Sequence, residues 1–116
     1  MAKEQYVIYN LERFFPTVEF GIDLIKSELQ RCRKQNIVVI KIIHGYGSSG
    51  RGGQLRLGVR RFLQELLQKG SIQGISWGEN FSIFDETTRK MLEMIPELRR
   101  DTDLERSNHG ITMVLL

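Results

Sequence analysis

A continuous apolar run near the middle of the chain, residues 37–43, constrains the fold more than any other segment. Only Lys41 interrupts this run. A strand that is apolar at every position, instead of at alternate ones, is typical of a strand covered on both faces in an α/β sheet. The run leads directly into a glycine-rich segment, residues 44–56, after which apolar residues recur at helical spacing. The sequence therefore predicts an α/β fold in which a buried strand ends in a glycine loop that opens a helix.

The rest of the chain predicts an alternation of strands and helices. An aromatic and β-branched segment over residues 6–11 predicts a first strand, and Thr17 is a plausible N-cap for the helix that follows. Further predictions are a helix over 55–67 closed by Gly70, a strand over 72–77, a helix capped by Asp85 and ended before Pro96, a polar loop over 99–108 and a strand over 111–116. The order is β-α-β-α-β-α-β. Helices between successive strands require crossover connections, so we expect an at least partly parallel sheet.

Length and composition favour one domain over residues 1–116. The contents of 41% hydrophobic and 27% charged residues are ordinary for a globular protein. The net charge of +3 is weak evidence for an anionic partner, but the placement of the charge is more informative. Four arginines lie in or directly after the glycine loop, namely Arg51, Arg56, Arg60 and Arg61. This placement concentrates positive potential at the loop.

Several features exclude other classes of protein. The single cysteine, Cys32, excludes an intramolecular disulfide and a zinc site built from several cysteines, and we expect it to pack as a small apolar residue in a helix. No apolar run approaches the ~20 residues of a membrane span, and the N-terminus lacks the apolar core of a secretion signal. We therefore expect a cytoplasmic protein without a membrane partner.

The glycine loop has the features of an anion-binding segment. Glycine permits a positive φ and the close approach of a ligand, and a following helix N-terminus supplies unpaired N–H groups. The loop contains no G-x-x-x-x-G-K-[ST] motif and no complete G-x-G-x-x-G motif, so the alternative is a flexible connector whose arginines are solvated. The residues that we expect to contact an anionic ligand are Gly45, Tyr46, Gly47, Arg51, Gly53, Arg56 and Arg60.

Two histidines precede a glycine at a predicted strand end. His44 follows the central strand and His109 comes before the last one. Imidazole titrates near neutral pH, so either side chain is a candidate general base, general acid or phosphate ligand. The alternative for His44 is a hydrogen-bonded core residue. If both strands present the same end to one crevice, the two histidines approach each other. The acidic residues of segment 101–105 are expected in a solvated loop, and their spacing alone does not indicate a metal site.

Three segments resemble the Smr (small MutS-related) domain. Thr17-Val18-Glu19 with its helix is similar to the first helix of that family. Residues 42–47, Ile-Ile-His-Gly-Tyr-Gly, with Gly-Gln-Leu-Arg at 53–56, resemble the family's H-G-x-G…L-R segment, and residues 110–116 resemble its closing G-A-T-x-V-x-L strand. The resemblance implies a two-layer α/β sandwich with a mixed four-stranded sheet, similar to the C-terminal domain of bacterial translation initiation factor three. It also implies nucleic-acid binding, with nicking endonuclease activity in some members.

The chain departs from the family pattern in two places. Members that cut nucleic acid commonly carry an L-D-x-H segment on the first strand, whereas residues 11–14 here read Leu-Glu-Arg-Phe. Glu12 can replace the aspartate, but Phe14 can neither move a proton nor bind a metal, unless His109 substitutes for the missing histidine. A helix-bearing insertion of about residues 81–107 also separates the last two strands. This insertion could cover the site or recruit a partner.

These observations leave three hypotheses for the function. The leading one is a domain that grips phosphates of DNA or RNA, structured or branched, at the His-Gly-x-Gly loop, with weak or lost endonuclease activity. The second is a nicking endonuclease that uses His44, with Arg56 stabilising the phosphorane charge and Glu12 orienting a group or binding a divalent metal ion. The third is a protein-interaction module that uses the inserted helix. The sequence does not reveal the oligomeric state.

Overall fold

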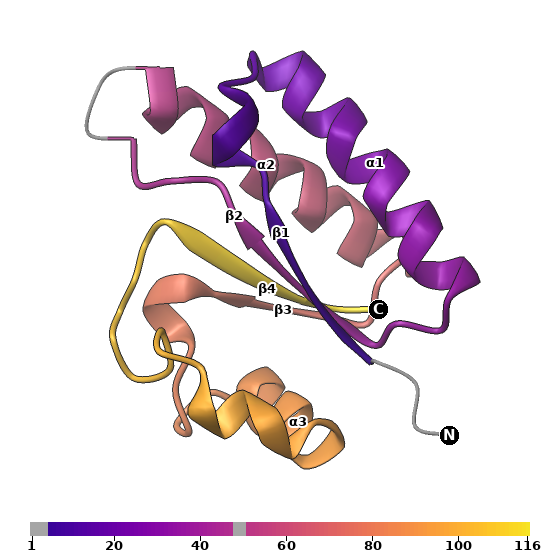
Figure 1. The fold of residues 1–116 in the computed structure, drawn as a ribbon, viewed down its shortest axis with the longest axis vertical. Helices are drawn as coiled ribbons and strands as arrows, with labels where there is room; N and C mark the ends of the chain where they lie inside the picture. Colours follow the sequence, from indigo (N-terminus) through magenta and orange to yellow (C-terminus); the bar gives the residue numbers. More distant parts are fainter. Residues whose placement is uncertain (1–4, 48–50) are drawn as a thin grey trace.

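The computed structural model describes residues 5–47 and 51–116, without the side chains of 51 and 52, and it follows the predicted order of elements (Figure 1). The strands are β1 (Tyr6–Asn10), β2 (Val39–Ile43), β3 (Gly74–Trp77) and β4 (Ile111–Leu115), and the α-helices are α1 (Val18–Lys34), α2 (Arg51–Gln68) and α3 (Glu86–Met94). Short 3-10 helices follow β1, β3 and α3, namely η1 (Glu12–Phe14), η2 (Gly78–Asn80) and η3 (Pro96–Arg100). The prediction of a loop from residue 99 is wrong for its first two residues, because Pro96 starts a 3-10 helix that buries Leu98.

Local signals in the sequence set the helix ends. The Thr17 hydroxyl accepts a hydrogen bond from the N–H of Phe20 at 3.2 Å, and the Asp85 carboxylate accepts one from the N–H of Thr88 at 2.9 Å. Helix α2 ends just before Gly70, whose φ of 74° suits glycine. These three predicted boundaries are confirmed. No helix in the described part of the chain is long and apolar enough to cross a membrane.

The sheet has the strand order β1-β2-β4-β3, and β4 runs antiparallel to both of its neighbours while β1 and β2 are parallel. This arrangement confirms the predicted mixed four-stranded sheet. The register places Ile43 opposite Ile111 and Trp77 opposite Thr112. The ends of β2 and β3 therefore lie beside the start of β4. As a result, the glycine loop, η2 and the segment before β4 all share one end of the sheet.

Helices α1 and α2 cover one face of the sheet, while α3 and η3 lie against the other (Figure 1). The sheet with α1 and α2 forms the predicted two-layer sandwich, and the inserted segment adds a second core. Strand β2 serves both cores, because Ile40 and Ile42 pack on the α1–α2 side and Val39 packs on the α3 side. This double coverage explains the continuous apolar run. Cys32 packs in the first core as predicted, where burial raises the pKa of its thiol to about 11.

The apolar residues of the inserted segment divide into buried and exposed positions. Phe81 and Met91 are buried in the second core. Phe84 and Met94, for which the sequence favours packing against the core, instead have exposed fractions of 86% and 48%. Phe84 precedes the cap residue Asp85 and so lies outside the apolar face of α3. The insertion therefore uses only part of its apolar surface to cover the sheet.

A buried ionic network ties the inserted segment to the sheet. The Nζ of Lys41, in β2, lies 2.8 Å from Oδ1 of Asp101 and 2.5 Å from Oδ2 of Asp103, and all three side chains are largely buried. The Tyr6 hydroxyl donates to Asp101 at 2.8 Å, and the Asn108 amide donates to Asp103 at 2.8 Å. Burial alone would lower the pKa of Lys41, but its hydrogen bonds to the two carboxylates raise it overall. The expectation of a solvated acidic loop is wrong for Asp101 and Asp103, because Lys41 pairs with their carboxylates, whereas Glu105 is exposed.

Candidate functional site

His44 is a buried, hydrogen-bonded residue at the end of β2. Its Nδ1 lies 2.9 Å from the carbonyl oxygen of Gly45, and its Nε2 lies 2.9 Å from the hydroxyl oxygen of Thr112. Because a carbonyl can only accept, Nδ1 carries the proton and the Thr112 hydroxyl donates to Nε2. Burial, together with the positive charges of Arg60 and Arg56, lowers the pKa of His44 from 6.5 to about 4. Both ring nitrogens therefore hold the fold together at the mouth of the loop.

The two His-Gly junctions meet through their backbones. The N–H groups of His44 and Gly45 both donate to the carbonyl oxygen of Gly110, at 3.0 and 2.9 Å. A Cβ on Gly110 would lie 3.2 Å from the amide nitrogen of Tyr46, tighter than an ordinary contact, so this close approach favours glycine. The side chain of His109 lies elsewhere, 44% exposed, while that of His44 is buried. The structure thus brings the two junctions together but directs their imidazoles to different neighbours.

Glu12 reaches the glycine loop from η1. Its carboxylate lies against the Cα of Gly45, and a Cβ at this glycine would collide with Oε2 of Glu12. Gly45 also has a φ of 84°, a backbone conformation that residues other than glycine rarely adopt. The close approach that this glycine permits is therefore occupied by a carboxylate, so an anionic ligand must approach the loop from another side.

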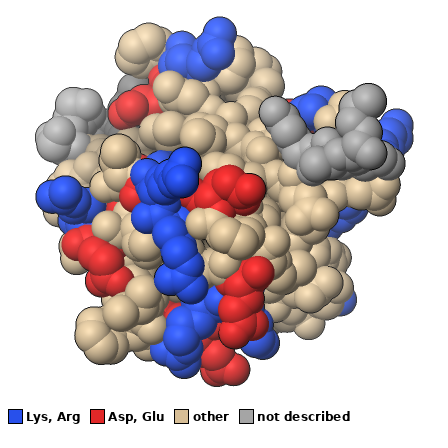
Figure 2. Space-filling view, turned by 60° about the horizontal axis from the view of Figure 1, so that its bottom comes forward, with Lys and Arg blue, Asp and Glu red and all other residues tan. Residues whose placement is uncertain are grey.

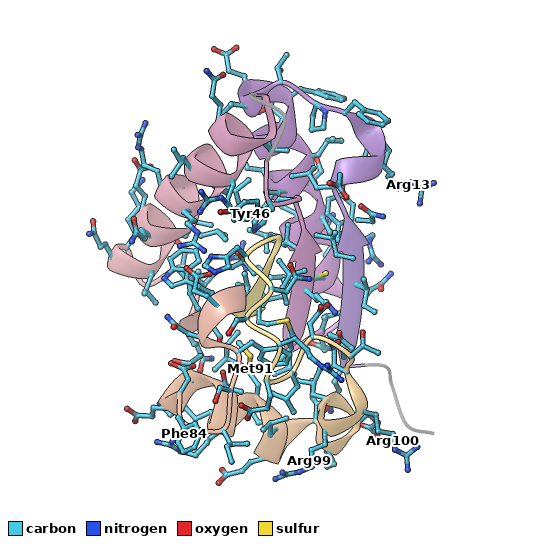
Figure 3. The ribbon with its side chains drawn as sticks, turned by 90° about the vertical axis from the view of Figure 1, so that its left-hand side faces the viewer. Arg13, Tyr46, Phe84, Met91, Arg99 and Arg100 are labelled. Atoms are coloured by element: carbon cyan, nitrogen blue, oxygen red, sulfur yellow. The ribbon has the colours of Figure 1, made fainter. Side chains whose placement is uncertain are left out.

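Tyr46 forms the exposed centre of the site. The Arg56 Nε donates to the Tyr46 carbonyl at 3.2 Å, and the guanidinium carbon lies 5.4 Å from the centre of the Tyr46 ring. The His109 ring meets the Tyr46 ring edge-on, with centroids 5.6 Å apart at 78°. Tyr46 nevertheless remains 58% exposed. Figure 3 shows it near the middle of the end of the molecule that faces the viewer. Arg56 and His109 thus hold the ring while leaving it accessible.

A second arginine is paired with an acidic residue that the sequence did not single out. Arg60 forms an ion pair with Glu79, the middle residue of η2, and its guanidinium carbon lies 4.7 Å from the centre of the Trp77 ring. The Nδ1 of His109 lies 3.8 Å from Oε1 of the same Glu79. Burial would raise the pKa of Glu79, but the hydrogen bond and charge of Arg60 lower it overall. The signal in the sequence was an acidic residue two positions after the end of a predicted strand.

The remaining predicted residues belong to the loop and the start of α2. Gly47 has a φ of 88°, and a Cβ on Gly53 would lie 3.5 Å from the carbonyl oxygen of Gly47. The structure therefore brings the described glycines of the motif together. The side chain of Arg51 and residues 48–50 lie outside the described part of the chain.

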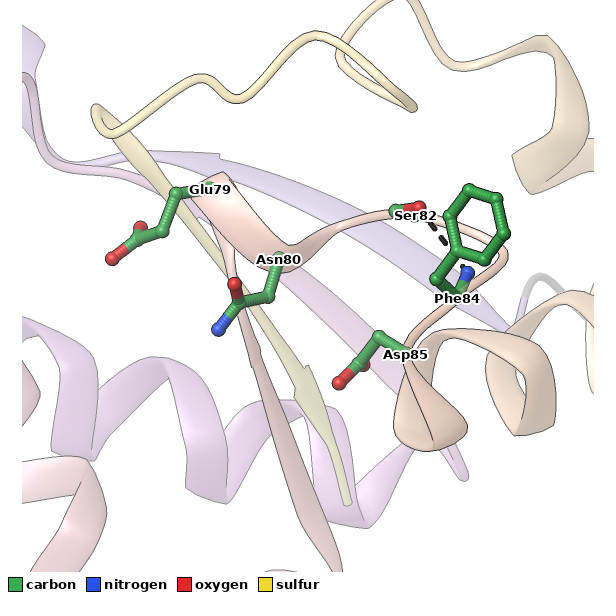
Figure 4. Close-up of a pocket in the computed structure, with 5 residues that line it drawn as sticks. All are labelled: Glu79, Asn80, Ser82, Phe84 and Asp85. Carbon is green, nitrogen blue, oxygen red and sulfur yellow. Dashed lines mark hydrogen bonds between the residues drawn. The ribbon is translucent and has the colours of Figure 1, made fainter.

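Glu79 also lines a hollow of about 290 Å³ that does not include Tyr46 (Figure 4). Its lining is Glu79, Asn80, Ser82, Phe84 and Asp85. Figure 4 shows the two carboxylates and the Asn80 amide directed to the same side. A hollow with two carboxylates repels phosphate, so the Tyr46 side of Glu79 is the better anion surface. Within residues 5–47 and 53–116, no three or more His, Cys, Asp or Glu side chains gather as metal ligands.

A family model for the Smr domain matches residues 16–79, which are 64 of the 116 residues. The chain belongs to the Smr domain family. Membership suggests a nucleic-acid-binding or nuclease-like function. Neither the search of curated proteins nor the search of solved structures found a match.

The matched range of this Smr domain contains part of the site. His44, Arg56 and Glu79 lie inside residues 16–79, whereas Glu12 and His109 lie outside them. The contacts of Glu12 with Gly45, and of His109 with Tyr46 and Glu79, join these outer residues to the matched core. The site is therefore assembled from the family-matched core and from the two segments that flank it.

Proposed function

We propose that this Smr domain binds nucleic acid, DNA or RNA, through the end of the sheet that carries the glycine loop. The proposed contact surface consists of the loop residues Gly45–Gly47 with Arg56. Structured and branched nucleic acids are the proposed partners, because they expose backbone and bases together. We propose weak or lost cleavage for the same surface, since His44 is buried and Phe14 replaces the histidine that the family pattern places on the first strand.

The observation that carries this proposal is the position of Arg56. Its guanidinium lies over the exposed Tyr46 ring, and none of the ion pairs between described residues includes it. Arginine presents a planar fork of donors that suits phosphate, and it also stacks on bases. Arg60, in contrast, is neutralised by Glu79. Arg56 is thus the described cation best placed to meet a backbone phosphate beside the loop.

The face formed by the inserted segment offers a less suitable surface. Figure 2 brings this side of the molecule forward and shows Lys and Arg side chains interspersed with Asp and Glu. Interspersed charges give little net potential along a polyanion. This contrast favours the glycine-loop end as the contact surface.

We expect Arg56→Ala to weaken binding to a three-way DNA junction and to an RNA hairpin. Loss of one phosphate contact should reduce the slope of log affinity against log salt by about 0.9 for DNA. Glu12→Gln should strengthen binding, because it removes a negative charge that lies against Gly45. Fluorescence anisotropy titrations between 50 and 200 mM salt, roughly the range over which phosphate contacts dominate affinity, measure both effects.

Arg99→Ala provides the matched control. Arg99 is an exposed arginine of η3, and Figure 3 shows it at the bottom of the view, far from Tyr46. The Arg99→Ala substitution lowers the net charge by the same amount as Arg56→Ala does. Equal losses for the two variants would contradict the proposal, because the effect would then follow total charge and not the site.

A nicking endonuclease is the second candidate, and the pair His109–Glu79 favours it. The exposed imidazole lies 3.8 Å from a carboxylate and beside Tyr46, so a phosphate held by Arg56 would be within its neighbourhood. His109 would take a proton from the attacking water, and Arg56 would stabilise the charge that develops on the phosphate. His44 is less suited to this role, since both of its nitrogens are engaged.

For this candidate we expect wild-type protein to nick supercoiled plasmid and His109→Gln to lose about 100-fold or more of the rate, the usual contribution of a general base. Agarose gels that resolve nicked from supercoiled plasmid measure the rate. Arg99→Ala, prepared in the same way, should retain full activity. Nicking by His109→Gln at the wild-type rate would eliminate His109 as the base.

A further inference from the structure

Two arginine–aromatic pairs lie open to solvent at the glycine-loop end of the sheet. The guanidinium carbon of Arg13 lies 5.4 Å from the centre of the Phe14 ring, and that of Arg56 lies 5.4 Å from the centre of the Tyr46 ring. Phe14 is 44% exposed and Tyr46 is 58% exposed. These rings follow β1 and β2, which are neighbouring parallel strands. Of these two aromatic residues, only Tyr46 belongs to the glycine loop, and Phe14 adds a second ring outside it.

The exposure of these rings has no explanation within the fold. The Phe14 ring contacts the Tyr9 ring at a centroid distance of 6.2 Å, yet much of its surface is exposed to solvent. The next residue, Phe15, is 86% exposed and has a left-handed backbone with φ 45° and ψ 49°. A bulky residue in this conformation is strained, and strain of this kind is concentrated at functional sites. Apolar exposure and strain in one segment indicate that a ligand covers it.

We propose that Tyr46 and Phe14 stack on bases of an unpaired stretch of DNA or RNA, while Arg56 and Arg13 hold the neighbouring phosphates. This inference rests on the proposed nucleic-acid binding and specifies the form of nucleic acid that is bound. Bases in a duplex are stacked on each other and present only their edges, whereas unpaired bases offer their faces to aromatic side chains and arginines.

A third arginine–aromatic pair, Arg60 with Trp77, is engaged within the protein and indicates the direction in which the bound nucleic-acid strand runs. Arg60 covers Trp77, Glu79 holds Arg60, and Trp77 packs against the first core. Trp77 is the last residue of β3, so this pair lies at the other end of the strand order β1-β2-β4-β3. The two open pairs lie beyond the ends of β1 and β2, so the bound nucleic-acid strand runs from Tyr46 toward Phe14 and away from Glu79.

Charge favours nucleic acid over a protein partner on this surface. Each open ring carries a guanidinium, which suits a ligand with a phosphate beside every base. The Glu12 carboxylate lies against Gly45, the residue before Tyr46. It repels phosphate there, which favours the Arg56 side of the Tyr46 ring for the nucleic-acid backbone. Figure 3 shows Arg13 extending outward at the edge of the molecule, apart from Tyr46, so a ligand that contacts both must be extended.

The test compares a labelled single-stranded oligonucleotide, in DNA and RNA versions, with the same sequence in a perfect duplex. We expect wild-type protein to bind the single strands more tightly than the duplex. Tyr46→Leu and Phe14→Leu should each weaken single-strand binding by about 5-fold or more, the usual effect of losing one stacked base, and should weaken duplex binding by a clearly smaller factor. Phe84→Leu is the matched control, since Phe84 is 86% exposed but lies in the inserted segment. Thermal unfolding followed by circular dichroism verifies that each variant folds.

The outcomes separate this inference from the function on which it rests. Binding to duplex as tight as to single strands, with no loss in Tyr46→Leu, would overturn the stacking inference and leave nucleic-acid binding intact. Binding to none of the oligonucleotides would overturn both. A loss in Phe84→Leu equal to that in Tyr46→Leu would also overturn the inference, because general exposure of aromatic rings would then explain the effect. The DNA and RNA arms show which strand the site prefers.

Discussion

Lys41→Met should destabilise the protein by about 3–5 kcal/mol, the usual cost of removing one partner of a buried ion pair. The substitution keeps an unbranched side chain of similar length but leaves Asp101 and Asp103 without their cation in a largely buried position. Burying unpaired carboxylates is far more costly than burying a paired set. Urea unfolding of wild type and variant at pH 7 measures the difference in the free energy of unfolding.

Two further variants make this result interpretable. Lys34→Met, at an exposed position of α1, should change the free energy of unfolding by less than about 0.5 kcal/mol. Adding Asp101→Asn and Asp103→Asn to Lys41→Met removes the unpaired charges and should recover part of the lost stability. This triple variant keeps the question answerable if Lys41→Met fails to fold. Equal stability of Lys41→Met and Lys34→Met would show that the network does not stabilise the fold.

Acidification should destabilise the protein through His44. The imidazole is neutral in the folded protein because burial lowers its pKa to about 4, whereas in the unfolded chain it binds a proton near its ordinary value of 6.5. The stability that this group contributes is thus fully present above pH 6.5 and is lost as the pH falls toward 4. From the pKa difference we expect a loss of about 2 kcal/mol between pH 7 and 5, and about 3 kcal/mol by pH 4.

Chemical unfolding at a series of pH values measures this loss. His44→Gln should be less stable than wild type at pH 7, since Gly45 and Thr112 lose their partner, but its stability should fall much less between pH 7 and 5. His109→Gln should still show the loss, because His44 remains in place. The prediction fails if wild type and His44→Gln lose stability in parallel over this range.

Much of the fold was predictable because it depends on local patterns. Thr17, Asp85 and Gly70 mark helix ends by their own chemistry, and the apolar run 37–43 indicates a doubly covered strand. The fate of Phe84 was not predictable, since it depends on where the insertion crosses the second face of the sheet. The role of Lys41 was also hidden, because its partners lie 60 and 62 positions away in the sequence.

The candidate site shows the same limit more sharply. The sequence indicates the loop residues and both histidines, but not the directions of their side chains. The orientation of His44 depends on Thr112, which lies 68 positions later and faces it only through the pairing of β2 with β4. Glu79 belongs to the site because it contacts Arg60 and His109, and these three residues come from three different segments of the chain. Contacts between distant segments, and not local propensity, determine which candidates are exposed.

The central position of β4 has a consequence for the kinetics of folding. Strand β4 pairs with both β2 and β3, and in the described sheet it is the only strand that joins β3 to the others. The β1-α1-β2 unit can form from contacts close in sequence, but the pair Ile43–Ile111 closes a long segment of chain. Closing such a long segment costs conformational entropy before the contacts between the paired strands can stabilise the fold. We therefore expect β3 to join the sheet, and the surface beside the glycine loop to form, only after β4 has paired with β2.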